Sequence, residues 1–456
     1  MSNSKKNITI SRSRLAKQFS QEQERFVRQH PKSQTLFEQA QQHLLGGVPM
    51  SWMTRWPGGF PIFAQSAEGA HLTDVDGQRY LDLCLGDTGA MAGHAPAATL
   101  QAVMAQAQRG FTYMLPTEDA IWIGQELQRR FGLPYWQMTL TATDANRSAI
   151  RLAREITERN RILVFNQCYH GTVDEALVSL YGRKVVPRPG NIGFPINPGF
   201  TTRVIEFNDV KALEQALAEK DVACVLAEPA MTNIGIIHPQ LGFHDALRSL
   251  TREAGTLLIL DETHTMCAGP GGYTQAFGLE PDILTVGKSL GGGIPCGAYG
   301  LSEALAERAA ALTDNPHGDV SGLGGTLAGN ALSLAAMRAT LEHVLVEASF
   351  ARTIPLTEYF SAGVQVVINE FELPWIVKQL GCRAEYWFRP TAPQNGGEAV
   401  IAADEELDAY MHLFALNRGI LMTPFHNMAL ISPEVTEADI DQHTAVFREA
   451  VMSLLG

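Results

Sequence analysis

Lys288 and Asp261 are the two residues whose positions in the sequence best suit covalent chemistry. Lys288 follows the apolar run PDILTVG and precedes a glycine cluster, whereas Asp261 ends the apolar run LLILD. Burial of a lysine disfavours its charged form and leaves an amine that can form a Schiff base. A carboxylate in an apolar setting needs a cationic partner, and a protonated pyridine nitrogen is one. A lysine combined with an aspartate for a pyridinium nitrogen is what pyridoxal phosphate (PLP) chemistry requires.

The segments around these residues predict a parallel sheet covered by helices. From about residue 95 to 305, helix-like segments such as ANRSAIRLAREITERN alternate with strand-like ones such as RILVFN. The runs DVACVLAEP, GTLLILDE and PDILTVGKS are short and continuously apolar, as buried parallel strands are. The polar residues at the ends of these runs are Glu228, Asp261, Glu262 and Lys288. Ligands of such sheets bind outside the carboxyl ends of the strands, so these residues form one candidate site.

The two ends of the chain predict a second, smaller unit. Residues 60–85 show strand-like alternation interrupted by the turn signal DVDG, and the chain after residue 330 mixes long helices with short strands. We therefore expect an α/β protein with a large central domain and a small α+β domain assembled from both chain ends. The expected boundaries are 1–85 for an N-terminal arm and part of the small domain, 86–335 for the large domain, and 336–456 for the rest of the small domain.

The composition argues against several other classes of protein. The 456 residues include 35 Lys and Arg against 48 Asp and Glu, a net charge of −13, which disfavours nucleic acid as a ligand. No run approaches the roughly 18 apolar residues of a membrane span, and the first residues lack the apolar core of a signal peptide. The six cysteines show no spacing typical of a zinc site. We expect a cytoplasmic protein without a metal, a membrane or a nucleic-acid partner.

An ordered set of motifs resembles the class III aminotransferases of PLP fold type I. The set runs from GGVPMSWMTRWPGG and DVDGQRYLDL through GHAP, PTE, SAIRLAR, CYHG, AEP and LLILDE to PDILTVGK, GGGIPCGA and GTLAGNALSLAA. A single motif would be weak, but the set covers about residues 40–450 in the family's order. Within the class, the chain is most similar to glutamate-1-semialdehyde aminomutase, β-amino-acid transaminases and related ammonia-lyases.

The resemblance implies PLP as the cofactor and assigns roles around it. Lys288 matches the lysine that forms the Schiff base with PLP, and Asp261 matches the aspartate at the pyridine nitrogen. Tyr169 and His170, in CYHG, fall where the family places an aromatic ring on the cofactor. Thr326, in GGTLAGN, matches a position that reaches the cofactor phosphate of the neighbouring subunit, which implies a homodimer with shared active sites.

The expected phosphate loop departs from the family pattern. Where relatives have Ser-Gly-Thr, this chain has Thr141, Ala142 and Thr143, and the Cβ atom of Ala142 restricts the backbone. Backbone N–H groups at a helix start still attract phosphate, and two threonine hydroxyls add hydrogen bonds. The alternative is that Thr143 or Asp144 only caps the helix.

Four other residues are expected near the cofactor, and two of them, His264 and Glu228, have two possible roles each. Thr263 stands where relatives have an apolar residue under the ring. His264 either orients Asp261 by a hydrogen bond or packs as a core residue. Glu228 is similar to a family glutamate near the active site, with a capping or salt-bridge role as the alternative. Asn233 resembles a family position on the substrate side.

The substrate pocket is expected to contain an anion anchor. Arg55 lies in the region where the family grips a substrate carboxylate with an arginine, and the alternative is a surface arginine stacked between Trp52 and Trp56. Arg383 and Arg389 are further candidates of this kind.

Polar residues elsewhere in the pocket argue against a second carboxylate. Asp87 and Thr88 match positions that line the substrate pocket in relatives, where an acid favours an amine or hydroxyl partner; the alternative is a structural Asp87 in a Gly-rich turn. Asn427 stands near the place where many ω-transaminases carry a second arginine, so a dicarboxylate acceptor is disfavoured.

Three reactions are compatible with this set of residues. The first is transamination of a small amino acid or amine, with Lys288 moving the α-proton as general acid and base. The second is release of ammonia from a small hydroxy-amino compound such as 1-hydroxy-2-aminoethylphosphonate, which the altered phosphate loop and the Asp87–Thr88 pair support. The third is an aminomutase. A non-enzymatic role would predict loss of Lys288 or Asp261, and both are present.

Overall fold

A seven-stranded sheet forms the centre of the computed structural model, which describes residues 10–193, 197–313 and 322–456. Its strand order is β4, β12, β11, β10, β9, β5, β8. In that order the strands are Tyr135–Thr139, Gly297–Leu301, Ile283–Gly287, Leu257–Asp261, Val222–Ala227, Arg161–Phe165 and Thr202–Ile205. Neighbouring strands are parallel except where β12 pairs with β11 and β4. The predicted mostly parallel α/β fold is confirmed, although β12 follows the glycine cluster in a segment where no strand was predicted.

Helices cover both faces of this sheet because its strands are apolar on both sides. Successive residues of a strand point to opposite faces. Accordingly, Ile259 packs in the core beneath α5 (Ala142–Thr157), whereas Leu258 and Leu260 pack in the core beneath α7 (Phe243–Ala254). The other helices of this part are α3 (Ala97–Ala107), α4 (Glu118–Phe131), α6 (Val210–Leu217), α8 (Gly272–Phe277), α9 (Glu303–Thr313) and α10 (Ala331–His343). A separate hairpin is formed by β6 (Val178–Tyr181) and β7 (Lys184–Pro187).

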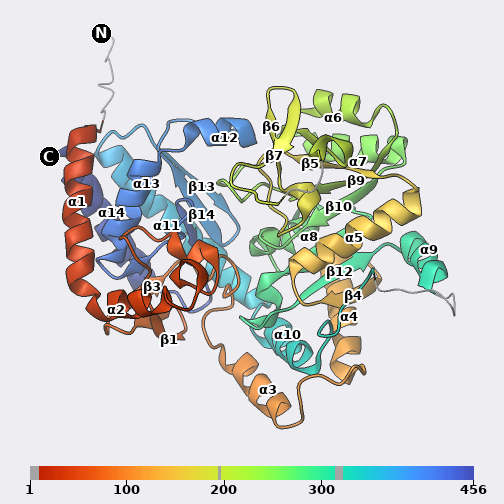
Figure 1. Cartoon of the computed structure of the whole chain (residues 1–456), viewed down its shortest axis with the longest axis horizontal. Coiled ribbons are helices and arrows are strands. Elements are labelled where there is room, and N and C mark those ends of the chain that lie inside the picture. Colours follow the sequence, from red (N-terminus) through yellow and green to blue (C-terminus); the bar gives the residue numbers. More distant parts are fainter. Residues whose placement is uncertain (1–9, 194–196, 314–321) are drawn as a thin grey trace.

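A second unit combines the two ends of the chain, as Figure 1 shows on the side away from the large sheet. One sheet has the order β1 (Ala64–Glu68), β2 (His71–Asp74), β3 (Arg79–Asp82) and β15 (Ile420–Leu421), and a second has the order β13 (Ile376–Leu380), β14 (Arg383–Trp387) and β16 (Met428–Leu430). The helices here are α1 (Arg12–Gln29), α2 (Pro31–Ala40), α11 (Glu347–Glu370), α12 (Gly396–Ala402), α13 (Glu405–Leu416) and α14 (Glu437–Leu455). Their shared core joins Leu15 to Val451. The exact boundaries at residues 85 and 335 stay a prediction.

Short helical turns connect these elements and carry some of the site. They are η1 (Leu45–Gly47), η2 (Ser51–Thr54), η3 (Asp174–Ala176), η4 (Pro198–Phe200), η5 (Thr265–Ala268) and η6 (Lys288–Gly291). Within the described ranges, no helix is both long and apolar enough to cross a membrane. In the same ranges, no group of three or more His, Cys, Asp or Glu side chains is arranged to hold a metal ion.

Candidate active site

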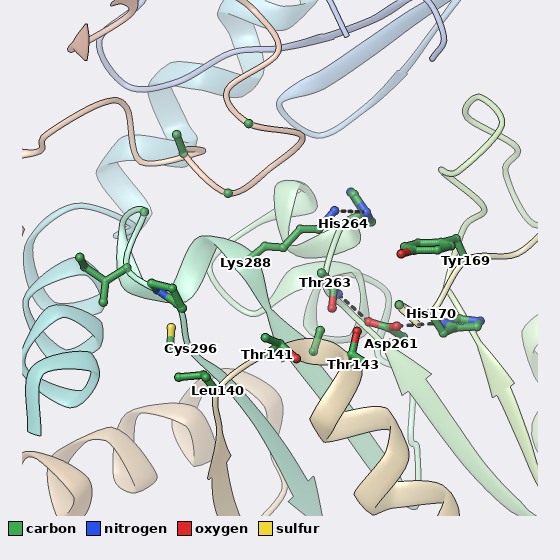
Figure 2. Close-up of a pocket in the computed structure, with 18 of the residues that line it drawn as sticks. Leu140, Thr141, Thr143, Tyr169, His170, Asp261, Thr263, His264, Lys288 and Cys296 are labelled. Carbon is green, nitrogen blue, oxygen red and sulfur yellow. Dashed lines mark hydrogen bonds and ion pairs between the residues drawn. The ribbon is translucent and has the colours of Figure 1, made fainter. Parts of the chain in front are cut away.

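A cavity of about 500 Å³ lies at the carboxyl ends of β10 and β11 (Figure 2). Asp261 is the last residue of β10, and Lys288 directly follows β11. This volume is within the roughly 300–1,000 Å³ of typical small-molecule sites. All residues predicted to touch the cofactor line the cavity except Glu228 and Thr326, namely Thr141, Ala142, Thr143, Tyr169, His170, Asp261, Thr263, His264 and Lys288.

Asp261 is held as a buried carboxylate by three neighbours. Its Oδ2 atom accepts a hydrogen bond from Asn146 Nδ2 at 2.8 Å and lies 2.9 Å from His170 Nδ1, while Oδ1 accepts from the backbone N–H of Thr263 at 3.0 Å. Burial alone would raise the pKa of Asp261, but the hydrogen bond and charge of His170 lower it to about 2. The carboxylate is therefore ionised and can face a cationic ring nitrogen.

His170 is a partner of Asp261 and does not serve as a stacking ring. Its side chain is fully buried, and its Nδ1 atom faces the Asp261 carboxylate. Tyr169, the other predicted ring, lies beside the cavity and its ring centroid is 5.3 Å from that of Trp52. Tyr169 is therefore the candidate for the aromatic ring on the cofactor, whereas His170 orients the Asp261 carboxylate. Sequence reasoning gave that orienting role to His264 as one of two options.

The loop at the start of α5 forms a cradle of backbone and hydroxyl groups. Thr141 is the N-cap of α5 and accepts a hydrogen bond from the Asp144 backbone N–H, so the capping role proposed for Thr143 or Asp144 belongs to Thr141. The side chain of Thr143 instead accepts from the backbone N–H of Thr172 at 3.3 Å. Free N–H groups at a helix start attract anions. Thr141, Ala142 and Thr143 all border the cavity at this point, and Figure 2 shows both threonines there.

Gly171 keeps the phosphate cradle open, which predicts the effect of Gly171→Ala. A Cβ atom at this position would lie 2.0 Å from Thr143 Oγ1, and the residue has a positive φ of 80°. We expect the variant to bind PLP at least about tenfold more weakly, a loss of about 1.4 kcal/mol, as measured by fluorescence titration. Gly190→Ala is the matched control because Gly190 has φ 83° and nothing within 4 Å. Equal affinities in the two variants would contradict the crowding argument.

Lys288 is engaged by His264, which lines the cavity, and by Asp87, which like Thr88 is not among the lining residues. Its Nζ atom donates a hydrogen bond to Asp87 Oδ2 at 2.8 Å and lies 2.9 Å from His264 Nε2. Lys288 itself has φ 48°, an uncommon conformation for a residue with a side chain. Burial alone would raise the pKa of Asp87, but the nearby charges, of which Lys288 has the largest effect, lower it below its usual range.

The turn that carries Asp87 and Thr88 is left-handed over four consecutive residues. Their φ angles are 47° at Leu85, 58° at Gly86, 50° at Asp87 and 83° at Thr88. Left-handed backbone costs roughly 1–2 kcal/mol for each residue other than glycine. Strain of this kind persists where the surrounding structure holds it, and functional sites are where it concentrates. Asp87 is therefore more than a turn residue, since the turn directs its carboxylate at Lys288.

His264 does not orient Asp261, so this option from the sequence is wrong. Its Nδ1 atom lies 2.9 Å from Thr88 Oγ1 and 3.2 Å from Arg383 Nη2, and its Nε2 atom faces Lys288. It is not a simple packed core residue either. The hydroxyl of Thr263 is buried at the cavity and has no hydrogen-bond partner among the described residues.

The predicted anion anchor Arg55 is not part of this cavity. Arg55 is exposed beyond η2 and does not line the cavity, so the structure does not support its contact with a substrate there. Asn233 donates to the backbone carbonyl of Gln167 at 3.0 Å and also lies outside the lining. Arg389 is partly exposed, whereas Arg383 is fully buried on β14 and contacts His264 and Thr88. The position of Arg383 beside His264 could not be predicted from the motif GCRAEYWFRP alone.

The two remaining cofactor candidates lie outside the lining for different reasons. Thr326 is exposed in the single chain, so its contact with a second subunit stays a prediction. Glu228 is buried behind the cavity, where its Oε2 atom accepts hydrogen bonds from the backbone and hydroxyl of Thr232. The other carboxylate oxygen has no partner among the described residues.

Burial of Glu228 predicts a pH-dependent stability. Burial raises the pKa of Glu228 from its usual 4.5 to about 7. The folded protein therefore retains a proton that the unfolded chain has lost, so the contribution of Glu228 to stability is full below about pH 4.5 and is lost as the pH rises to about 7. We expect the free energy of unfolding of Glu228→Gln, measured on the PLP-free protein, to rise relative to that of wild type by up to about 3 kcal/mol as the pH goes from about 4.5 to about 7. An equal pH dependence in Glu228→Gln and wild type would contradict the raised pKa, and exposed Glu303→Gln is the control.

Comparisons with known proteins identify the family. The model of the family described as Aminotransferase class-III matches residues 52–451. The chain is 33% identical over 418 residues to glutamate-1-semialdehyde 2,1-aminomutase of Methanosphaera stadtmanae, covering 90% of this chain and 96% of that protein. The chain therefore belongs to the class III aminotransferases.

Solved structures agree with this assignment. A glutamate-1-semialdehyde-aminomutase from Pseudomonas aeruginosa PAO1 has a TM-score of 0.96 and 47% identity, covering 98% of this chain and 100% of that one. A lysine-to-alanine variant of the Pseudomonas aeruginosa PAO1 aminomutase is known in complex with PMP. An omega-transaminase from Sphaerobacter thermophilus has a TM-score of 0.86 and 28% identity, covering 93% of this chain and 98% of that one.

The cofactor of the family, PLP, fits the residues present. The cavity offers an amine at Lys288, an ionised carboxylate at Asp261 and an aromatic ring at Tyr169. The cradle at Thr143 is kept clear by Gly171, where even one added carbon would collide. The unpartnered Thr263 hydroxyl provides one more polar contact. An anion, a flat ring, a ring cation and an aldehyde are thus each matched by a group of the site.

Proposed function

We propose that this chain uses PLP to move the amino group of a small amino compound through Lys288, and that it returns the nitrogen to the same molecule as an aminomutase. The observation that carries the amino-group chemistry is the arrangement of Lys288 and Asp261 around one cavity. The names of the aminomutase relatives support the intramolecular form. Transamination to a second molecule would use the same residues and differ only in the compound that takes up the nitrogen.

The residues of the site have separate tasks in this reaction. When bound, PLP supplies an aldehyde that condenses with amines and a ring that takes up the electrons of a broken bond. Asp261, fixed by His170 and Asn146, would hold the proton of the ring nitrogen. The start of α5 would hold the phosphate. Lys288 Nζ would remove a proton from the substrate carbon and return it elsewhere, as general base and then general acid.

A second candidate function is release of ammonia from a hydroxy-amino compound. Two observations favour it. Asp87 lies 2.8 Å from Lys288 Nζ, so a carboxylate occupies the region where a substrate acid would need a cation. Among the described residues that line the cavity, Lys288 is the one lysine or arginine. A substrate with a hydroxyl near its amine suits the Asp87 carboxylate better than a dicarboxylate does, because a hydroxyl can donate a hydrogen bond to it whereas like charges repel.

One experiment separates these reactions. The PLP-loaded full-length protein is mixed with glutamate 1-semialdehyde, α- and β-amino acids, amines and 1-hydroxy-2-aminoethylphosphonate, without a keto acid. An aminomutase would give an isomeric product over many turnovers with no ammonia. A transaminase would convert its cofactor once and need an added carbonyl compound to continue. Ammonia in many equivalents per site would identify a lyase and overturn the proposal.

A further inference from the structure

Asn146 is a fully buried amide in the interior of α5, one helical turn beyond Ala142 at the edge of the cavity. Asparagine is a weak helix former, and a buried amide is costly unless its groups are hydrogen-bonded. Its Nδ2 atom donates to Asp261 Oδ2 at 2.8 Å and to the backbone carbonyl of His170 at 3.1 Å. Its Oδ1 atom accepts from Thr285 Oγ1 at 2.6 Å. Asn146 therefore uses both of its N–H groups and its oxygen, and all three partners lie outside its own helix.

The chemistry of these partners determines which way the Asn146 amide faces. A backbone carbonyl and an ionised carboxylate can only accept hydrogen bonds, whereas a threonine hydroxyl can donate one. If the amide were turned over, its oxygen would face the oxygen atoms of Asp261 and His170 without a proton between them. In the observed orientation the hydroxyl of Thr285 gives the amide oxygen its donor. Thr285 and the two acceptors thus fix the orientation of Asn146 together.

Thr285 lies beside Asp261 in the central sheet. It is in the middle of β11 and is paired with Asp261 of β10 in the parallel register. Its side chain is fully buried, and it is the one polar side chain of this strand, ILTVG. Valine has nearly the same shape and suits a buried strand equally well, so packing does not require a hydroxyl here. The contact with Asn146 accounts for the hydroxyl of Thr285.

The two carboxylate oxygens of Asp261 differ in how many partners they have. Oδ2 accepts from Asn146 Nδ2 and lies 2.9 Å from His170 Nδ1, so two nitrogen atoms already face it. Among the described residues, Oδ1 accepts only from the backbone N–H of Thr263. A carboxylate oxygen can accept two hydrogen bonds, and Asp261 borders the cavity. Oδ1 is therefore the oxygen with a place left for a cationic ring nitrogen.

We propose that Thr285 is a positioning residue that acts through Asn146. It holds the amide so that Nδ2 fixes Oδ2 of Asp261, and Oδ1 is left to accept a hydrogen bond from the ring nitrogen of PLP. Neither Thr285 nor Asn146 lines the cavity, so both act on the cofactor only through the carboxylate. This inference rests on the proposed role of Asp261 at the ring nitrogen.

The test compares the affinity of the full-length chain for PLP with its affinity for an analogue that has C–H in place of the ring nitrogen. Both compounds carry the same aldehyde and phosphate, so the ratio of the two affinities reports the contact at the ring nitrogen. Thr285→Val is expected to lower this ratio about tenfold relative to wild type, because Asn146 Oδ1 loses its donor and the amide is no longer held. Thr285→Ser should keep the wild-type ratio, since it retains the hydroxyl. Fluorescence titration of the PLP-free protein measures both affinities.

Thr202→Val is the matched control, because Thr202 is also a buried threonine of this sheet, and its hydroxyl donates to the backbone carbonyl of Glu175 at 2.9 Å. It should show the wild-type ratio. Asn146→Leu should lower the ratio at least as far as Thr285→Val does. The double variant should lower it no further than Asn146→Leu, since Thr285 acts through Asn146. A wild-type ratio in Thr285→Val, or losses that add in the double variant, would overturn the inference.

The outcomes also separate this inference from the proposed function. If wild type bound PLP no more tightly than the analogue, Asp261 would not contact the ring nitrogen, and its role in the proposed function would be overturned together with the inference. A preference for PLP in wild type that persists unchanged in Thr285→Val would overturn the inference alone.

A second pair of variants serves if Thr285→Val does not fold. Cysteine and serine at position 285 have similar shapes, but a thiol is a much weaker donor than a hydroxyl. The affinity ratio of Thr285→Cys is expected to be at least about threefold below that of Thr285→Ser. Equal ratios in the two variants would overturn the inference.

Discussion

Replacing Lys288 with alanine is expected to abolish both the visible absorbance of the covalently bound cofactor and turnover. The Nζ atom is the one amine of the cavity lining in the described part of the chain, so no other lining residue can form a Schiff base in its place. Loss of the general acid and base alone costs on the order of 10²–10⁴ in rate. The phosphate cradle and Asp261 are untouched, so the variant should still bind PLP without a covalent link. Visible spectra and equilibrium dialysis measure the two properties separately.

The control for this variant is Lys211→Ala, which removes an exposed lysine of α6. It should keep the spectrum and turnover of wild type. A visible spectrum that Lys288→Ala shares with wild type would refute the assignment of the lysine, because another residue would then hold the cofactor.

The positions of Lys288 and Asp261 could be predicted from the sequence because local signals determine them. Each residue ends a continuous apolar run, and the runs became neighbouring parallel strands β11 and β10. Parallel strands present their carboxyl ends at the same edge of a sheet, so Lys288 and Asp261 are expected at the same edge. The helix-like segment predicted at 145–160 is observed as α5 (Ala142–Thr157), and its N-cap, Thr141, lies at the edge of the same cavity.

The partners of these residues could not be predicted because they come from distant parts of the chain. Asn146 and His170 converge on Asp261 from separate segments, and neither motif indicates this contact. Arg383 reaches His264 across 119 positions of sequence. The left-handed turn around Asp87 contains three residues other than glycine with positive φ, which residue preferences argue against. Where a site depends on tertiary packing and strained backbone, local patterns give no signal.

The position of Arg55 outside the cavity lining could not be predicted for a related reason. Residues 45–63 contain only the short turns η1 and η2, so their side chains form no periodic face from which their direction could be inferred. Trp52 from the same turn does reach the cavity, and its ring packs near Tyr169 and Phe425. Arg55 is only three residues beyond Trp52, yet Trp52 lines the cavity and Arg55 does not.

Asp261→Asn is expected to keep PLP bound but to lose about 10²–10³ in turnover, the size typical of a removed electrostatic contact in an enclosed site. An amide carries no charge to hold a proton on the ring nitrogen, so the ring withdraws electrons less strongly. One oxygen of Asp261 also accepts from Asn146 Nδ2. Asparagine at position 261 would place its own N–H₂ group opposite one of the groups that now donate to the carboxylate, such as Asn146 Nδ2, and that hydrogen bond would be lost.

His170→Gln tests the same contact from the other side. Burial alone would lower the pKa of His170, but its neighbours Cys168 and Asp261 raise it to about 10. Removing this cation should let the Asp261 carboxylate gain a proton at higher pH, so turnover of His170→Gln should fall towards acid pH where wild type does not. Exposed Asp245→Asn is the control for both variants. If turnover of Asp261→Asn stayed near that of wild type, the carboxylate would not assist the ring nitrogen, and the buried pair with His170 would serve only to stabilise the fold.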